Sequence, residues 1–260
     1  RRSTVLAENG MVATSQPLAS QSGLQILKNG GNAADAAVAT AAVLNVVEPM
    51  STGIGGDMFA LYWDNKQKKV FALNGSGRQS INANTKDLSD LGLKSIPNEK
   101  DNSHFAVSVP GTVDGWESLI TKFGSMKLSD VLRDSIDYAE KGFPVSEIIS
   151  NTWRSKEVVE KLKFRKSGDQ FLPSGNAPKY GEFVKLPELA KSLRIISEGG
   201  AKAFYNGEIG SAISNFIQSE GGWLCMDDLI NHKSEWIEPI STNYRGYDIR
   251  YITFICKSIC

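Results

Sequence analysis

Histidine and cysteine are scarce in this sequence, and their scarcity removes several kinds of active site from consideration. The 260 residues include two histidines, His104 and His232, each in a polar stretch without a recognisable partner. No G-x-S-x-G elbow is present, so we expect no histidine-dependent triad and ordinary surface or hydrogen-bonded roles for both histidines. The three cysteines, Cys225, Cys256 and Cys260, are an odd number without metal-like spacing. This argues against a disulfide framework and against a zinc site.

An excess of charge of one sign is also missing, because 29 Lys and Arg residues balance 29 Asp and Glu residues. Nucleic acid and anionic membrane surfaces are therefore not expected as partners. The longest apolar stretch, residues 33–47, is rich in alanine and interrupted by Asp35, Thr40 and Asn45, which predicts a buried helix and no membrane span. The first residues do not resemble a signal peptide, which favours a cytoplasmic location, and the missing initial methionine indicates a trimmed or partial chain.

Repeats, low-complexity tracts and proline-rich linkers are absent, so no domain boundary is visible. Apolar residues at helical spacing predict helices from Pro17 to the Gly30-Gly31 pair, and over residues 33–47 (capped by Asn32), 129–141, 146–162, 186–198 and 207–220. Another helix is expected after Pro110-Gly111-Thr112, with apolar residues at helical spacing from Val113 to Phe123. The runs Phe59–Trp63 and Val70–Leu73 predict a hairpin, and strands are expected near the end, at Ile237, Ile240, Tyr247, Ile249 and Tyr251. This order of elements favours an α+β fold with helices layered on a sheet.

Two glycine-rich loops are candidates for binding. Gly53–Asp57 lacks the G-K-[ST] ending of a phosphate loop and the third glycine of a dinucleotide fingerprint, so a tight bend is favoured over nucleotide binding. The second loop, Asn74–Arg78, has two glycines that allow close backbone approach and an arginine whose planar fork can bind a carboxylate with two hydrogen bonds. From the residues alone, Arg78 is equally compatible with an ordinary surface ion pair.

Several segments, taken together and in order, resemble the gamma-glutamyltransferase family. They are Gly10–Ser15, Pro17–Ser20, Gly30–Ala39, Glu48–Asp57, Asn74–Arg78, Pro110–Val113, Phe204–Gly207 and Tyr244–Tyr247. The ordered set is specific although no single segment is. The resemblance implies that residues 1–249 are a single-domain large-subunit portion. Its expected fold is a helix-rich, partial αββα sandwich of the N-terminal-nucleophile hydrolase type that lacks the strands of the small subunit.

The resemblance also implies a reaction and a division of roles. A precursor cleaves itself, and the new N-terminal threonine of a small subunit attacks a γ-glutamyl amide such as glutathione, without a metal or an organic cofactor. Arg78 corresponds to the arginine that binds the substrate α-carboxylate, and this chain contributes no catalytic residue. Thr112, which follows a glycine, is the one internal residue that could become an N-terminal threonine, but we expect it to be a helix N-cap.

This sequence departs from the family pattern in two places. Gln79 follows the arginine where the best-known members have an acidic residue, so a related acylase that cleaves glutaryl amides remains an alternative. Residues 250–260 resemble nothing in the family and form a divergent tail, which indicates a truncated or frameshifted end. We therefore expect the chain to be inactive alone, and a non-catalytic ligand-binding or truncated product is the remaining alternative.

Overall fold

The computed structural model describes residues 3–97, 103–164 and 166–252. They form two compact units, one within residues 3–53 and 119–197 and the other within residues 54–118 and 198–252, apart from the residues that are not described. The prediction that residues 1–249 form a single domain stays a prediction. Cys256, Cys260 and most of the tail at 250–260 lie outside the described residues.

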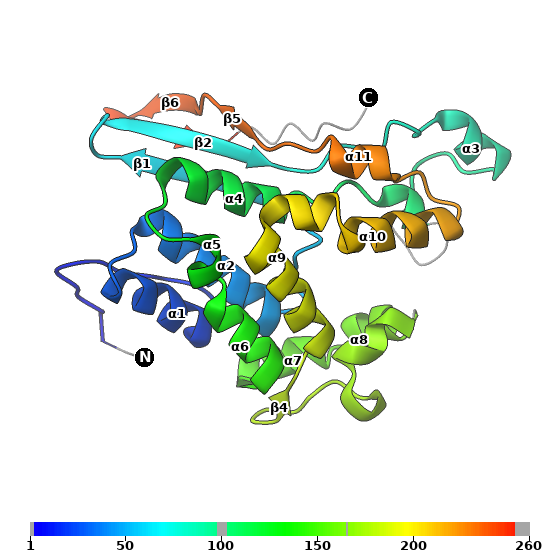
Figure 1. Ribbon diagram of the computed structural model, residues 1–260, viewed down its shortest axis with the longest axis horizontal. Coiled ribbons are helices and arrows are strands. Elements are labelled where there is room, and N and C mark those ends of the chain that lie inside the picture. Colours follow the sequence, from blue (N-terminus) through cyan, green and yellow to red (C-terminus); the bar gives the residue numbers. More distant parts are fainter. Residues whose placement is uncertain (1–2, 98–102, 165, 253–260) are drawn as a thin grey trace. The chain divides into compact units, whose positions relative to one another are not determined.

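The first unit begins with two adjacent helices, which confirm the predicted pair. Helix α1 spans Pro17–Lys28 and α2 spans Ala33–Val47, and both are drawn in blue in Figure 1. As predicted, Asn32 caps α2, and its side chain accepts hydrogen bonds from the backbone of Ala34 and Asp35. Helix α2 is buried on most of its surface because its many alanines allow close packing.

A fully buried carboxylate ties α2 to the loop after α4 (Thr112–Phe123). Asp35 accepts hydrogen bonds from the hydroxyl of Ser125 at 2.6 Å and from the backbone N–H groups of Ser125 and Met126. The side-chain amide of Asn32 donates to the carbonyl of Phe123 at 2.6 Å. The Gly-Asn-Ala-Ala-Asp segment is therefore a junction between two helices, in which the buried charge is satisfied by donors.

The remaining elements of the first unit correct two helix predictions. Residues 129–141 form two helices broken at Leu132. Residues 146–162 also form two helices: the first ends at fully buried Trp153, and the second buries no side chain. Hydrophobic spacing continues through such short breaks, so it does not reveal them. The elements are α5 (Leu128–Val131), α6 (Arg133–Lys141), β3 (Phe143–Pro144), α7 (Glu147–Trp153), α8 (Lys156–Phe164), η2 (Lys166–Phe171), η3 (Pro173–Gly175) and β4 (Phe183–Val184), with β3 antiparallel to β4.

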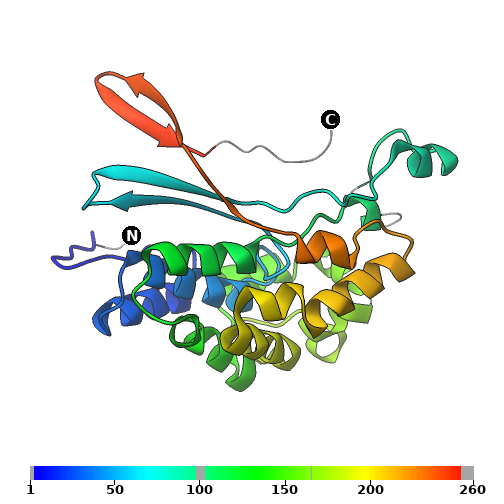
Figure 2. The same cartoon turned by 45° about the horizontal axis from the view of Figure 1, so that its top comes forward.

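The second unit is built on a three-stranded antiparallel sheet in the order β1-β2-β5. The predicted hairpin is confirmed as β1 (Met58–Asp64) and β2 (Lys69–Gly75), and β5 (Glu235–Ile237) pairs with the end of β2. The predicted late strands are also present. Figure 2 shows two of them, β6 (Ile240–Tyr244) and β7 (Tyr247–Tyr251), as a separate hairpin that projects away from β1 and β2.

The helices of the second unit include one that runs longer than predicted. Helix α9 (Pro187–Tyr205), which the unit boundary divides, continues beyond a non-helical Gly200, whereas the sequence predicts its end at residue 198. The other elements are α3 (Thr85–Asp90), η1 (Ser103–Ala106), α10 (Glu208–Ser219) and α11 (Met226–Ile230). The expectation of a helix-rich α+β fold is confirmed. None of the described helices is long and apolar enough to cross a membrane.

Candidate functional site

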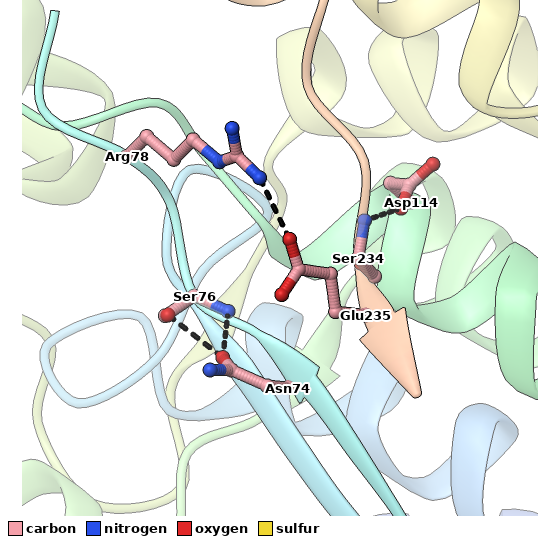
Figure 3. A network of polar contacts seen from close by, with 6 residues as sticks. All are labelled: Asn74, Ser76, Arg78, Asp114, Ser234 and Glu235. Atoms are coloured by element: carbon pink, nitrogen blue, oxygen red, sulfur yellow. Dashed lines mark hydrogen bonds and ion pairs between the residues drawn. The ribbon is translucent and has the colours of Figure 1, made fainter. Parts of the chain in front are cut away.

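The loop that carries Arg78 begins with a buried asparagine at the end of β2. The side-chain oxygen of Asn74 accepts hydrogen bonds from the backbone N–H of Ser76 at 3.0 Å and from its hydroxyl at 2.7 Å (Figure 3). An asparagine that binds the backbone two residues further on closes a tight turn. This turn ends β2 and leads the chain toward Gly77 and Arg78.

Gly77 lies so close to neighbouring backbone that no side chain fits. A Cβ atom on Gly77 would lie 1.5 Å from the carbonyl oxygen of Val109, and one on Gly111 would lie 1.8 Å from that of Gly75. The backbone N–H of Val109 donates to the carbonyl of Arg78 at 3.0 Å. The two loops therefore pack backbone against backbone, which only glycine permits at these positions.

The glycine cluster before β1 meets the same two loops. The carboxylate of Asp57 accepts a hydrogen bond from the N–H of Gly77 at 2.8 Å. The carbonyl oxygen of Gly56 accepts from the N–H groups of Gly111 and Thr112 at 2.8 and 2.9 Å. A phosphate loop presents N–H donors, whereas this cluster presents acceptors. The contacts favour the interpretation of the cluster as a structural bend.

Thr112 is the first residue of α4 and is buried, with 4% of its surface exposed. The helix begins at Thr112 itself, one residue earlier than a cap at this position requires, so the N-cap prediction is wrong by one residue. Gly111 precedes the helix, and its carbonyl accepts a hydrogen bond from Gly115 at 3.1 Å. The peptide bond before Thr112 is thus held inside the fold, which argues against its exposure as a new N-terminus.

Tyr205, at the end of α9, is hydrogen-bonded to the loop at residues 109–112 and to the start of α4. Its hydroxyl donates a hydrogen bond to the carbonyl of Pro110 at 2.6 Å and accepts one from the backbone N–H of Asp114 at 3.3 Å. Burial raises the pKa of the Tyr205 phenol far above its usual value, and the carboxylates of Asp114 and Asp57 raise it further. The phenol therefore keeps the proton that it donates to Pro110.

Arg78 extends from this arrangement toward β5. Strand pairing places Glu235 opposite Asn74, and the Nη2 atom of Arg78 lies 2.7 Å from Oε1 of Glu235 (Figure 3). The side chains are 53% and 41% exposed, respectively. The backbone of Ser234 is held by the carboxylate of Asp114, which accepts its N–H at 2.6 Å. The site thus presents one cation and one anion side by side, both accessible to solvent.

The structure brings together motifs that the sequence gives separately. The segments 54–57, 74–78 and 110–113 meet around Gly77, and Tyr205 of a fourth motif supports them. Sequence reasoning missed Glu235, because nothing in its local pattern connects it with an arginine 157 positions earlier. The histidines lie beside aromatic rings, with His104 next to Phe105. That Arg78 binds a substrate carboxylate stays a prediction.

Comparison with known proteins identifies the family to which the chain belongs. The sequence model of the gamma-glutamyltranspeptidase family matches residues 19–255, and the chain belongs to this family. A glutathione hydrolase-like YwrD proenzyme of Bacillus subtilis (strain 168) is 40% identical over 247 residues, which are 95% of this chain and 46% of that protein. A glutathione hydrolase proenzyme of the same organism is 38% identical over 94% of this chain and 41% of its own length.

Solved structures agree with the family assignment. The gamma-glutamyltranspeptidase of Helicobacter pylori matches with a TM-score of 0.89 and 31% identity, over 97% of this chain and 72% of that one. A cephalosporin acylase from Bacillus halodurans matches with the same TM-score and 41% identity, over 96% of this chain and 47% of that one. The chain therefore spans less than half the length of the curated relatives quoted above.

Proposed function

We propose that this chain is the larger part of a γ-glutamyl amide hydrolase or acyltransferase, and that it binds substrate but lacks the nucleophile. In this proposal a smaller partner segment supplies an N-terminal threonine, whose own α-amine serves as the base. The threonine attacks the γ-amide of glutathione or a related compound, and the acyl group then passes to water or to an amine. Arg78 holds the α-carboxylate of the substrate during these steps.

The observation that carries the proposal is the position of Arg78 at the point where the segments 54–57, 74–78 and 110–113 meet. Three backbone segments and Tyr205 form a hydrogen-bonded base under the loop, and the long side chain of Arg78 extends from it into solvent. A guanidinium on a rigid base is suited to fix a carboxylate in one orientation. Membership of a family whose relatives include glutathione hydrolases supports this use of the arginine.

Exposed apolar surface on the strands supports the need for a partner segment. On β1 every second side chain is exposed, namely Phe59, Leu61 and Trp63, and every residue of β6 and β7 is exposed. Exposed apolar side chains on strands are typical of interfaces or of sheets that another layer covers. We propose that the missing segment adds strands here and completes an αββα sandwich.

The proposal is tested by reconstitution with a γ-glutamyl anilide as substrate. We expect no turnover by the 260-residue chain alone, and turnover when a matching small segment is co-expressed with it. In the two-part protein, Arg78→Ala is expected to raise KM about 10- to 100-fold, because a charge-assisted contact to the carboxylate is lost. Arg133→Ala removes another exposed arginine, which pairs with Asp130, and serves as the matched control.

Two results would count against the proposal. Hydrolysis that follows the purified chain through every column, without any partner segment, would show that the nucleophile lies in this chain. Equal KM values for Arg78→Ala and Arg133→Ala in an active two-part protein would show that Arg78 is not the carboxylate anchor.

A second candidate function is supported by the likeness to the cephalosporin acylase of Bacillus halodurans, which is as similar to this chain as the glutathione hydrolase-like relative. A glutaryl amide has the same terminal carboxylate as a γ-glutamyl amide but lacks the α-ammonium group, so Arg78 could anchor it in the same way. A glutaryl anilide assayed beside the γ-glutamyl anilide separates the two functions by their ratio of kcat/KM.

A further inference from the structure

A pocket of about 540 Å³ lies in the first unit, beside α8 and the segment 173–182 that leads into β4; both elements are labelled in Figure 1. Its volume is within the range of sites that hold small molecules. Three side chains that line the pocket are charged, namely Arg154, Lys179 and Glu182, and three are apolar, namely Val159, Pro173 and Ala177. The pocket therefore combines charged groups with a short apolar wall.

Hydrogen bonds from buried side chains hold the walls of the pocket in place. Ser150 of α7 donates its hydroxyl to the carbonyl of Pro178 at 3.0 Å, and the indole N–H of fully buried Trp153 donates to a carbonyl of η2 at 2.9 Å. Arg154 comes directly after Trp153, and Lys179 comes directly after Pro178. Both cations are therefore attached to backbone that is fixed by buried contacts.

The backbone of the pocket includes a strained residue. Ser174 has a φ of 56°, a conformation that is uncommon for residues other than glycine. The side-chain amide of Asn176 donates to the carbonyl of Ser174 at 3.3 Å, and both residues line the pocket. Strained backbone is concentrated at ligand sites, so this conformation agrees with a role of the pocket in binding.

The three charged side chains of the pocket do not neutralise one another. Within the part of the chain that the structure describes, Arg154, Lys179 and Glu182 form no ion pair with each other or with another residue. The carboxylate of Glu182 accepts the backbone N–H of Lys179 at 2.8 Å, and all three residues are exposed. Two cations and one anion around one pocket leave a surplus of positive charge that a ligand can match.

From this arrangement we propose that the pocket binds a small ligand with two anionic groups, which contact Arg154 and Lys179, and one ammonium group, which contacts Glu182. Carboxylates bind arginine and lysine by charge-assisted hydrogen bonds, and an ammonium binds a carboxylate in the same way. Acidic amino acids and acidic dipeptides carry this set of charges, and the apolar wall accommodates their aliphatic part. The inference adds a second site and does not depend on the function proposed for Arg78.

The test is a calorimetric titration of the 260-residue chain at low ionic strength, where exposed charges are least screened. L-Glutamate and the dipeptide alanyl-glutamate carry all three charges, whereas glutarate lacks the ammonium group and L-glutamine lacks the second carboxylate. Saturable binding is expected for glutamate or the dipeptide, and the tighter of the two identifies the kind of ligand. Glutarate and glutamine are expected to bind about fivefold more weakly, because each loses one exposed charge contact.

Three variants assign the binding to this pocket. Arg154→Gln and Lys179→Gln are each expected to weaken binding of the tighter ligand about fivefold, since each removes one cation. Glu182→Gln is expected to remove the difference between glutamate and glutarate. Circular dichroism of the variants checks that the fold is retained.

The matched controls are Arg133→Gln and Lys141→Gln. Each removes a cation of the first unit that is already paired, Arg133 with Asp130 and Lys141 with Asp137, both at 2.9 Å. Both controls are expected to bind the ligand like the wild-type chain.

The inference is wrong if the wild-type chain binds neither glutamate nor the dipeptide, or if Arg154→Gln and Lys179→Gln bind like the two controls. Equal affinities of the wild-type chain for glutamate and glutarate would contradict the role of Glu182. Arg78→Ala separates this site from the proposed function, because binding that this variant retains does not come from a carboxylate on Arg78. Loss of binding in Arg78→Ala would place the ligand at the Arg78 loop and overturn the inference.

Discussion

Tyr205 shows how strongly one side chain can define the loops around Arg78. Its hydroxyl is shared between the carbonyl of Pro110 and the N–H of Asp114, and the ring is 5% exposed. Because burial raises the pKa of the phenol, the hydroxyl remains a donor across the accessible pH range. The start of α4 and the loop before it are thereby attached to the end of α9.

We expect Tyr205→Phe to lower the free energy of unfolding by about 1 to 2 kcal/mol, because the buried carbonyl of Pro110 loses its donor. Urea denaturation of the purified chain measures the change. Tyr180→Phe removes a hydroxyl from a side chain that is 72% exposed and is expected to change the free energy by less than about 0.5 kcal/mol. Equal losses in the two variants would contradict the role given to the Pro110 contact.

At the scale of the elements, the loops at 74–78 and 109–112 depend on residue type. Both are short connections whose backbones touch, and each contains a glycine for which no larger residue can substitute without displacement of a carbonyl. Some other glycines of the described residues lie in open space. Gly53 and Gly55, for example, have no atom within 4 Å of the position that a Cβ would take.

Gly77→Ala is expected to destabilise the chain by about 3 kcal/mol, since the added methyl group overlaps the carbonyl of Val109 and the loops must separate. Gly55→Ala is the matched control and is expected to have little effect on thermal unfolding. The comparison is made by calorimetry on both variants. A melting temperature for Gly77→Ala that equals that of Gly55→Ala would show that the loops do not pack as described.

At the scale of the whole molecule, the chain matches only part of the length of its relatives. It spans 46% and 41% of the two quoted Bacillus subtilis relatives, and its strands expose apolar side chains. The tryptophans differ in the same way between the buried interior and the exposed face of β1. Trp116 and Trp153 are almost fully buried, while Trp63 on β1 is 53% exposed.

We expect the fluorescence emission of Trp63 to shift to shorter wavelength when the partner segment binds, because strands added over β1 remove water from the indole. The shift is measured as the difference between the wild-type chain and Trp63→Phe, with and without the segment. Identical shifts in both proteins would mean that the segment binds without covering β1.

The sequence by itself determined the helices with long apolar spacing, the β1–β2 hairpin, the family and the candidate arginine, because these depend on patterns within a few residues or on the order of short motifs. Only the tertiary structure decided the break at Leu132, the attachment of Tyr205 to Pro110 and the position of Glu235 beside Arg78. Glu235 and Arg78 are 157 positions apart, and they meet because β5 pairs with β2 in one particular register. Strand register depends on the packing of the whole sheet, which no local pattern contains.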